Sequence, residues 1–217
     1  MSIENVLIVG SSGHAKVIID IFEKKDNCKI AGLIDSFKPL DENTFEYKIL
    51  GKEEDLPDIL SNTPFCKIFV AIGDNKTRAK VANKIKNILP NIEFISAIHP
   101  SAQIGKNVKI GKGVAIMAGA IINSDSIIED FAIVNTKASI DHDCKMFEFS
   151  SLGPNVTTGG NVNIGKFSTI GIGATISNGI TVGDNSIIGA CSLLLKDCKD
   201  NTVMYGFPAK EIRANKK

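Results

Sequence analysis

A histidine between two aspartates is the group in this sequence best suited to acid–base chemistry. The segment reads Ser139-Ile-Asp-His-Asp-Cys144 and places His142 between Asp141 and Asp143. Imidazole titrates near neutral pH, and a carboxylate bonded to one ring nitrogen leaves the other free to take a proton. We therefore predict that His142 is a general base, although a lone surface histidine is more often only solvated.

A metal site is the alternative interpretation of this histidine. Zinc sites in enzymes usually take several histidine ligands. The sequence holds three histidines in all, at positions 14, 99 and 142. A histidine-rich site would need more than this chain offers, so no metal is expected.

A second candidate site is formed by three turns that each follow a short apolar segment. The turns are Gly10-Ser-Ser-Gly-His14, Asp35-Ser36 and Gly73-Asp-Asn75. Ligands of open parallel sheets bind at the carboxyl ends of the strands, and the N-terminus of a following helix attracts phosphate. The first turn has only two glycines, so the dinucleotide fingerprint G-x-G-x-x-G is absent. The convergence of three strand ends nevertheless favours a nucleotide site over plain tight turns.

The elements that would position this second site form a small Rossmann-like α/β domain over residues 1–97. Apolar segments alternate with helical spacing, which is typical of a parallel sheet. The predicted strands are 6–9, 30–34, 68–72 and 94–98, and the predicted helices are 13–25, 53–60 and 75–89. The buried face of the first helix is predicted to comprise Val17, Ile18, Ile21 and Phe22. The polar stretch 35–47 is predicted to be a surface loop.

The element that would position His142 is an all-β domain over residues 98–217, built from a six-residue repeat. Aliphatic residues or methionine recur at every sixth position from Ile104 to Leu194, and Thr158 is the only exception. Two positions earlier lies a second row that is small or β-branched throughout and includes Cys144. Neither a helix nor an ordinary strand has this period, which is the signature of a solenoid of short strands. Three repeats make one triangular coil, so residues eighteen apart are expected to stack roughly 4.8 Å apart.

The stacking rule places His142 on a corner, meaning a turn between two strands, and outside the core. Gly160 lies eighteen residues further on and is expected to stack above it. Glycine follows many of the aliphatic residues, as at Gly105, and asparagine or aspartate follows others; all of these are predicted to adopt positive φ. After Leu194 the sequence predicts a polar connection, a turn at 205–210 and a short charged tail.

Composition excludes several classes of function. A net charge of +1 without any Lys/Arg run argues against nucleic-acid binding. The five cysteines form no C-x-x-C pair, which suits reduced thiols in a cytoplasmic protein. Neither a secretory signal nor an apolar run long enough to span a membrane is recognised. We therefore expect a cytoplasmic protein without nucleic-acid or membrane partners.

Together these motifs resemble those of the sialic acid O-acetyltransferase-like family of hexapeptide-repeat acyltransferases. The resemblance covers nearly the whole chain and rests on the turns named above, the Asp-His-Asp segment, His99-Pro-Ser-Ala102, Asn135-Thr136, Gly160-Asn161 and Gly206-Phe-Pro-Ala-Lys210. Within the family, the sequence is most similar to bacterial N-acetyltransferases of the bacillosamine-pathway type, which act on nucleotide-linked 4-amino sugars. The resemblance implies a left-handed parallel β-helix, acetyl-CoA as co-substrate, and a homotrimer with active sites in the clefts between helices.

The resemblance also implies roles for individual residues. Catalysis would involve His142, Asp143, Asp141 and Asn135. The nucleotide sugar would contact Gly10, Ser12, Gly13, His14, Asp35, Ser36, Gly73, Asp74 and Asn75. Acetyl-CoA would lie along Ser151, Gly160, Asn161, Ile172, Gly173, Ala190 and Pro208. The sequence departs from the family at Ser151, where many members carry a second histidine near the thioester, and at Lys145-Met-Phe147, which replaces the usual Ile-Gly turn.

The predicted activity is acetyl-CoA-dependent N-acetylation of a nucleotide-activated 4-amino sugar in bacterial surface-glycan biosynthesis. His142 would take the amine proton, and transfer would be direct because Cys144 lies in the inward row. The resemblance favours UDP as the carrier, while the residues themselves do not choose among uracil, guanine and thymine. Two alternatives remain, namely O-acetylation of a sugar such as sialic acid and a metal-dependent β-helix protein of the carbonic-anhydrase type.

Overall fold

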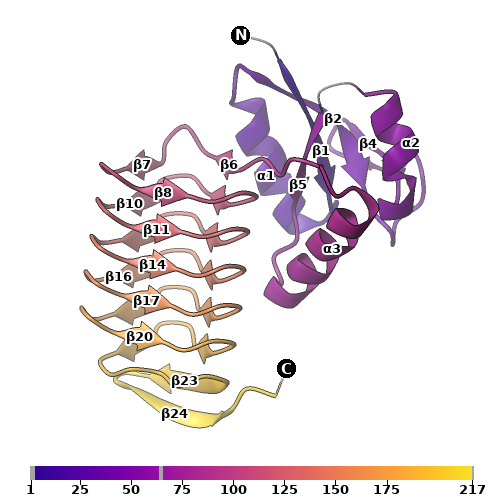
Figure 1. Ribbon diagram of the computed structural model, residues 1–217. Coiled ribbons are helices and arrows are strands. Elements are labelled where there is room, and N and C mark those ends of the chain that lie inside the picture. The colour runs from indigo at the N-terminus through magenta and orange to yellow at the C-terminus, as the bar shows by residue number, and fades with distance from the viewer. Residues whose placement is uncertain (1–2, 64–65, 217) are drawn as a thin grey trace. The chain divides into compact units, whose positions relative to one another are not determined.

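The computed structural model describes residues 3–63 and 66–216, and the chain divides between Pro100 and Ser101 into two compact units (Figure 1). The first unit combines helices with one sheet, and the second consists of short strands. No helix among the described residues has both the length and the apolar character needed to cross a bilayer.

The first unit is built on a five-stranded sheet. Its strands are β1 (Glu4–Val9), β2 (Cys28–Ile34), β3 (Asn43–Thr44), β4 (Tyr47–Gly51) and β5 (Cys66–Val70), in the order β3-β4-β2-β1-β5. Its helices are α1 (Gly13–Glu23), the 3-10 turn η1 (Glu53–Asp55), α2 (Leu56–Ser61) and α3 (Asn75–Ile88), and the short strand β6 (Ala97–Ile98) ends the unit. Strand β1 pairs in parallel with both β2 and β5, which confirms the predicted parallel α/β domain.

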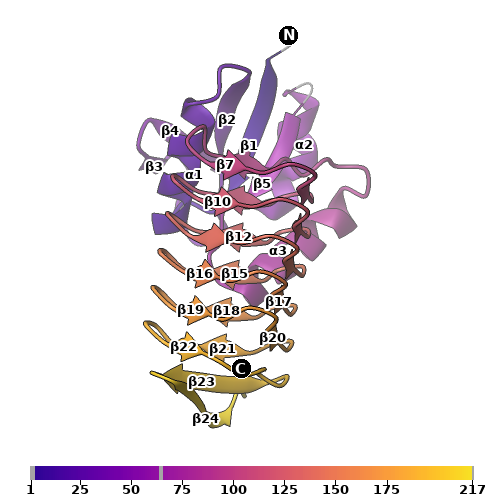
Figure 2. The same cartoon turned by 90° about the vertical axis from the view of Figure 1, so that its left-hand side faces the viewer.

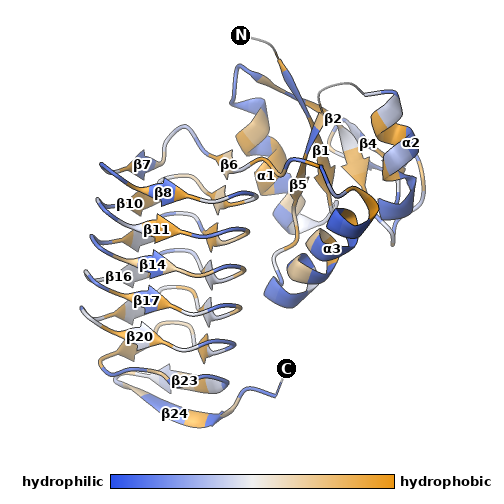
Figure 3. Cartoon of the chain, viewed as in Figure 1, coloured by the Kyte–Doolittle hydropathy of each residue, from blue (hydrophilic) through white to orange (hydrophobic). Residues whose placement is uncertain are grey.

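Burial explains the central place of β1. The aliphatic residues that end the strand, from Val6 to Val9, are all buried, so the strand needs cover on both faces. Figure 3 shows hydrophobic residues along β5 and hydrophilic residues over much of α3, as expected for a helix with one face in water.

Three local predictions for this unit are wrong. The stretch 35–47 is not only a loop, because it contains β3, which pairs antiparallel with β4. Val17 is 40% exposed, and Ala15 and Ile19 join the buried face of α1 instead. Of the predicted strand 94–98, only β6 is a strand, although Phe94 bridges to Ile68 in β5.

The second unit is a parallel β-helix of two-residue strands. The strands are β7 (Gln103–Ile104), β8 (Lys109–Ile110), β9 (Ala115–Ile116), β10 (Ile121–Ile122), β11 (Ile127–Ile128), β12 (Ile133–Val134), β13 (Ser139–Ile140), β14 (Lys145–Met146), β15 (Ser151–Leu152), β16 (Thr157–Thr158), β17 (Asn163–Ile164), β18 (Thr169–Ile170), β19 (Thr175–Ile176), β20 (Thr181–Val182), β21 (Ile187–Ile188) and β22 (Leu193–Leu194). Every third strand stacks into the same sheet, so one sheet runs β22-β19-β16-β13-β10-β7 and another β20-β17-β14-β11-β8 (Figure 2). The third sheet includes β9, β12, β15, β18 and β21.

The predicted stacking rule is confirmed by the register of these strands. Ile122 pairs with Ile104 in the coil before it and with Ile140 in the coil after it, so partners are eighteen residues apart. The aliphatic row is the second residue of every strand and is buried from Ile116 to Leu194. The first coil is the exception, because Ile104 is 40% exposed and Ile110 is partly exposed.

The predicted conformation of the glycines after the aliphatic row is wrong. Positive φ occurs two positions later in each repeat, as at Asn107 (φ 60°) and Asp125 (φ 61°), and not at Gly105. At Gly105 the reason for glycine is space, because a Cβ there would lie 2.7 Å from the backbone nitrogen of Ser124 in the next coil.

The chain after β22 forms a hairpin. Strand β23 (Thr202–Gly206) extends the third sheet from β21, and β24 (Ala209–Ala214) pairs antiparallel with β23. The predicted turn lies between them, with a cis peptide bond at Phe207–Pro208. The predicted charged tail is therefore largely a strand, because β23 offers it an edge to pair with.

A stack of three phenylalanines lines one corner of the β-helix. The rings of Phe131 and Phe149 are 4.9 Å apart and 3° from parallel, and those of Phe149 and Phe167 are 5.5 Å apart and 2° from parallel. All three residues have positive φ, between 56° and 60°. Below them a Cβ at Gly113 would lie 2.7 Å from the Phe131 ring, so glycine ends the stack.

Removing the middle ring should destabilise the second unit. Phe149→Ala should lower the free energy of unfolding by about 3 kcal/mol, because it opens a cavity and removes both ring contacts. Urea denaturation monitored by circular dichroism measures this change. The same substitution at Phe37, which is 97% exposed, is the control and should change stability by less than about 0.5 kcal/mol. Equal effects of the two substitutions would contradict a structural role for the stack.

Candidate active site

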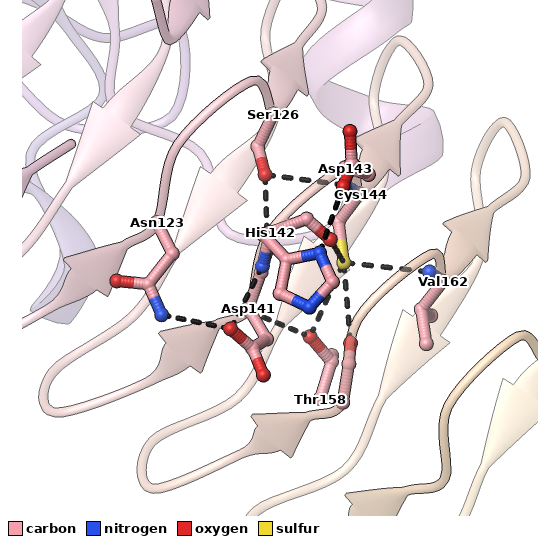
Figure 4. A network of polar contacts seen from close by, with 9 residues as sticks. Asn123, Ser126, Asp141, His142, Asp143, Cys144, Thr158 and Val162 are labelled. Carbon is pink, nitrogen blue, oxygen red and sulfur yellow. Dashed lines mark hydrogen bonds and ion pairs between the residues drawn. The ribbon is translucent and has the colours of Figure 1, made fainter. Parts of the chain in front are cut away.

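His142 lies on the corner that follows β13 and is paired with a carboxylate. Its Nδ1 is 2.8 Å from Oδ2 of Asp143 (Figure 4). A carboxylate accepts, so Nδ1 carries the proton of this hydrogen bond and Nε2 of the neutral ring carries the free lone pair. The side chains of His142 and Asp143 are both 55% exposed, which leaves the pair open to substrate.

Asp141 supports the same corner from the other side. Its Oδ1 accepts from the backbone N–H of His142 at 2.8 Å and from Nδ2 of Asn123 at 2.9 Å. These bonds lower the pKa of Asp141, with the Asn123 bond the largest cause. The pKa of His142 is raised, first by its hydrogen bond to Asp143 and then by the charge of Asp141. The corner therefore holds a histidine that is more basic than usual and still accessible.

Gly160 leaves open the space that the imidazole ring of His142 occupies. A Cβ at position 160 would lie 2.6 Å from Cε1 and 2.7 Å from Nε2 of His142, so the ring passes directly over this glycine. The predicted stacking of Gly160 above His142 is confirmed. Any larger residue at 160 would displace the ring from the Asp143 hydrogen bond or force the corner to move.

Beneath the corner, Cys144 points inward as predicted. The thiol is buried, lies 3.2 Å from the carbonyl oxygen of Gly159 and accepts from the N–H of Val162 at 3.4 Å (Figure 4). Burial raises its pKa, so the thiolate is disfavoured. Cys144 is thus a packing residue and is not placed to accept an acetyl group.

Two polar residues of this corner were missed by the sequence reasoning. Asn123 holds Asp141 from the preceding coil, and the hydroxyl of Thr158 accepts from the N–H of Asp141 at 3.3 Å. Both left a signal in the sequence. Thr158 is the one polar member of the aliphatic row, and Asn123 stands eighteen residues before Asp141.

Most of the other residues assigned to catalysis and to acetyl-CoA lie elsewhere on the β-helix. Asn161 is on the His142 corner, whereas Asn135, Ile172, Gly173 and Ala190 follow β12, β18 and β21. Those strands belong to the third sheet, and the corner after it leads into β13, β16, β19 and β22. The sheet that contains β13, β16, β19 and β22 therefore has this second corner, which we call the Ile172 corner, along one edge and the His142 corner along the opposite edge. One chain alone does not bring the two corners together.

Ser151 and Pro208 are also separate from His142 within one chain. Ser151 opens β15 in the third sheet and pairs with Ile133 and Thr169, and Pro208 lies in the β23–β24 turn. The other departure, Lys145-Met-Phe147, keeps the repeat, because β14 pairs in register with β11 and β17.

The three turns of the second candidate site meet at one edge of the N-terminal sheet. Val9 at the end of β1 pairs with Ile34 at the end of β2 and with Val70 at the end of β5. The residues that follow these strands, Gly10, Asp35 and the segment leading to Gly73, therefore share the carboxyl edge, as expected for a ligand site. Gly10 has φ 106°, and a Cβ there would lie 2.9 Å from the carbonyl oxygen of Ala71, so this turn requires glycine.

Several side chains predicted to contact the nucleotide sugar already have partners inside the unit. Asp35 accepts from the Ser11 hydroxyl at 2.6 Å, and Ser36 donates to the buried carboxylate of Glu53. Asp74 is the N-cap of α3, where its Oδ1 accepts from the N–H of Thr77 at 2.9 Å. Asn75 is buried and accepts from Arg78 at 2.6 Å. The side chains of Ser36, Asp74 and Asn75 thus first build the turns, and their contacts with substrate stay predictions.

A buried arginine that the sequence reasoning missed fixes the segment between β5 and α3. Arg78 is 1% exposed and donates to the carbonyl oxygens of Ile72 at 3.0 Å and Gly73 at 2.9 Å. It shares the buried face of α3 with Ala82 and Ile85, and a charged residue at that helical spacing was the available signal. Burial lowers its pKa to about 9.

His14 lies beside this arginine and is neutral at pH 7. Burial, followed by the charge of Arg78, lowers the pKa of His14 to about 4. Its Nε2 is buried and has no hydrogen-bond partner among the described residues. His14 therefore offers a neutral ring to the turn, and a direct contact between Nε2 and a ligand would require the turn to open.

Comparison with known proteins places this chain among sugar N-acetyltransferases. The family described as PglD N-terminal domain matches residues 5–85, and the bacterial transferase hexapeptide family (six repeats) matches residues 101–136 and 161–196. A mutant of perosamine N-acetyltransferase from Caulobacter crescentus, solved with CoA and GDP-perosamine, is 35% identical with a TM-score of 0.91, and the match covers 98% of each chain. The chain belongs to the hexapeptide-repeat sugar N-acetyltransferase family.

Two further members of this family resemble the chain. The acetyltransferase domain of PglB from Neisseria gonorrhoeae FA1090 is 28% identical with a TM-score of 0.87, over 96% of this chain and 100% of that one. UDP-N-acetylbacillosamine N-acetyltransferase from Bacillus subtilis (strain 168) is 33% identical over 105 residues, which is 48% of this chain and only 47% of that relative. The resemblance inferred from the motifs and the left-handed β-helix fold are thereby confirmed.

The described residues contain no group of three or more His, Cys, Asp or Glu side chains that could hold a metal ion. At the His142 corner the imidazole is bonded to a carboxylate, an arrangement that can accept a proton at Nε2.

The buried His14 should make stability depend on pH. The unfolded chain protonates this histidine near its ordinary pKa of 6.5, while the folded chain resists protonation until about pH 4. Stability from this group is therefore present above pH 6.5 and is lost as the pH falls toward 4. The loss should be about 2 kcal/mol between pH 7.5 and pH 5.

Chemical denaturation of the wild-type protein and of His14→Gln at the two pH values measures this effect. Carboxylates contribute equally to both proteins, so the difference between them isolates His14. The variant should lose less stability on acidification. Identical losses would mean that His14 is accessible to protons in the folded chain.

Proposed function

We propose that this protein transfers the acetyl group of acetyl-CoA to the amine of a nucleotide-linked amino sugar, as the names of its relatives suggest. The observation that carries the proposal is the His142–Asp143 pair at an exposed corner, in a chain that matches perosamine N-acetyltransferase over 98% of both lengths. The carboxyl edge of the N-terminal sheet supports a nucleotide site. A 4-amino sugar, a UDP carrier, a bacterial surface glycan as the destination and a cytoplasmic location are finer expectations of the same proposal.

The chemistry follows from the corner. The sugar amine attacks the thioester carbonyl carbon, and Nε2 of His142 takes the proton that the nitrogen loses. Asp143 stabilises the resulting imidazolium through Nδ1. The C–S bond then breaks, and the CoA sulfur leaves with a proton returned by His142. No acetyl-enzyme is needed, since Cys144 is buried and held by the next coil.

O-acetylation is the second candidate function. A hydroxyl is far harder to deprotonate than an amine, so a single histidine base suits an amine better. An assay of one nucleotide sugar carrying either an amine or a hydroxyl at the same carbon separates the two activities, and faster acetylation of the hydroxy sugar would overturn the proposal.

Substitution of His142 tests its role as base. His142→Asn should lower kcat by about 10² to 10⁴ and change the Michaelis constants little, because the lost group accepts a proton in the transition state. Turnover also falls as the pH drops through the pKa of His142, since only the neutral ring accepts a proton. Asp143→Asn removes the largest cause of the raised pKa, so its acid limb should move to lower pH. Near-wild-type turnover of a folded His142→Asn protein would remove His142 from the mechanism.

Gly160→Ala is a companion variant in the same assay. It keeps every reacting group and adds one methyl group that would lie 2.6 Å from the His142 ring. Turnover should therefore fall while circular dichroism stays unchanged.

We also propose a homotrimer, in which neighbouring chains complete each site. The two corners that carry the assigned residues border one sheet along opposite edges, so a second chain must bring an Ile172 corner to a His142 corner. Cyclic symmetry closes three such contacts. Ultracentrifugation measures the assembly, and a fully active monomer would contradict it.

Mixed trimers test the shared site directly. His142→Asn and Ile172→Asp should each be inactive alone, whereas coexpression should restore about a quarter of wild-type activity, because one interface of each mixed trimer keeps both corners intact. No recovery in mixed trimers would place both corners of a site in one chain.

A further inference from the structure

The segment that follows β2 presents an aromatic ring to solvent at the carboxyl edge of the sheet. Phe37 is 97% exposed, more than any other large apolar side chain in the described residues. It stands two residues beyond Asp35, where β2 ends next to β1. A ring this exposed adds little to the stability of the fold, because almost none of its surface is buried.

The backbone that carries this ring is nevertheless held firmly. Oδ1 of Asp35 accepts from the N–H of Phe37 at 2.9 Å, while Oδ2 accepts from the Ser11 hydroxyl at 2.6 Å. The carbonyl oxygen of Ser11 accepts in turn from Thr44 Oγ1 at 2.9 Å. The turn after β1, the segment after β2 and strand β3 are thus linked through Ser11 and Asp35.

This link sets the ring at a defined place relative to the N-terminus of α1. Helix α1 begins at Gly13, directly after the turn that Ser11 belongs to, and a helix N-terminus of this length favours a phosphate group. If the diphosphate of a nucleotide lay there, its ribose could reach the neighbouring strand end at Asp35, because β2 ends beside β1. The next group beyond the ribose is the base, and the next side chain beyond Asp35 that faces solvent with a flat apolar surface is Phe37.

We propose that Phe37 is the stacking platform for the base of the nucleotide and that the Ser11–Asp35 link is the device that positions it. The proposal rests on the proposed function and deepens it by assigning recognition of the base. A stacked ring reads the flat face of a base and not its edge, so it accepts both pyrimidines and purines. A larger purine overlaps the ring more and should gain more from it.

A protein partner is the competing occupant of this segment. Leu40 and Phe45 on the same segment are also exposed, and Lys16 lies 6.0 Å from the Phe45 ring. The Asp35 link favours the nucleotide, because it fixes the backbone of Phe37 itself and joins it to the phosphate turn.

The test is a calorimetric titration of the full chain with UDP, GDP and ribose 5-diphosphate, which lacks a base. Phe37→Ala should weaken UDP and GDP by about ten- to a hundredfold, with the larger loss for GDP, and leave ribose 5-diphosphate unchanged. Phe37→Trp should restore both. Phe45→Ala makes the same chemical change on the same segment and should leave all three affinities unchanged.

Asp35→Ala separates positioning from ribose contact. If Asp35 acts through Phe37, its substitution should weaken UDP but add nothing in the Phe37→Ala background, and ribose 5-diphosphate should bind as before. Loss of ribose 5-diphosphate binding alone, with additive effects on UDP, would assign Asp35 to the ribose and overturn its positioning role.

Three outcomes would overturn the platform. Phe37→Ala with unchanged UDP and GDP affinity would remove the ring from base recognition, as would an equal loss for ribose 5-diphosphate. An altered assembly state in Phe37→Ala without altered nucleotide affinity would assign the segment to a protein contact. A wild-type chain that binds neither UDP nor GDP at millimolar concentration would instead overturn the nucleotide site of the proposed function.

Discussion

The hydrogen bonds between successive coils are the constraint on which the second unit depends. Gly105 N–H donates to the carbonyl oxygen of Ile122 at 2.7 Å, and Gly171 N–H donates to that of Ile188 at 2.7 Å. A two-residue strand has no stability of its own, so each coil is held only by its neighbours. The same bonds fix the height of every side chain along the stack, and for this reason the His142 ring lies directly over Gly160.

Because two inward rows of small and aliphatic residues fill the core, the residues at the corners can be charged. Asp141, His142 and Asp143 all lie in solvent contact, where ionised groups keep their hydration and cost little. Departures from the family pattern are tolerated for the same reason. Met146 fills the core row and β14 keeps its register, although the corner that follows it differs from the usual turn.

In the first unit, by contrast, polar residues at the strand ends hydrogen-bond to one another. Asp35 joins two turns, Asp74 caps α3, and Arg78 holds carbonyl groups of the segment that follows β5. These bonds fix the edge of the sheet before any ligand arrives, which lowers the entropy that binding must overcome. Residue types that suit a ligand site are therefore also the types that build its turns.

The fold could be predicted from the amino-acid sequence alone, because a six-residue period of aliphatic residues indicates a solenoid of short strands, and strand–helix alternation predicts a parallel sheet. The sequence also identified His142 with its flanking aspartates and the stacking of Gly160, since the repeat converts sequence distance into spatial distance. The three-dimensional structure was needed to show which polar side chains already have partners, as with Asp35 and Arg78, and that the Ile172 corner lies across a sheet from His142. These hydrogen bonds join different segments of the chain, and no local sequence pattern specifies such partners.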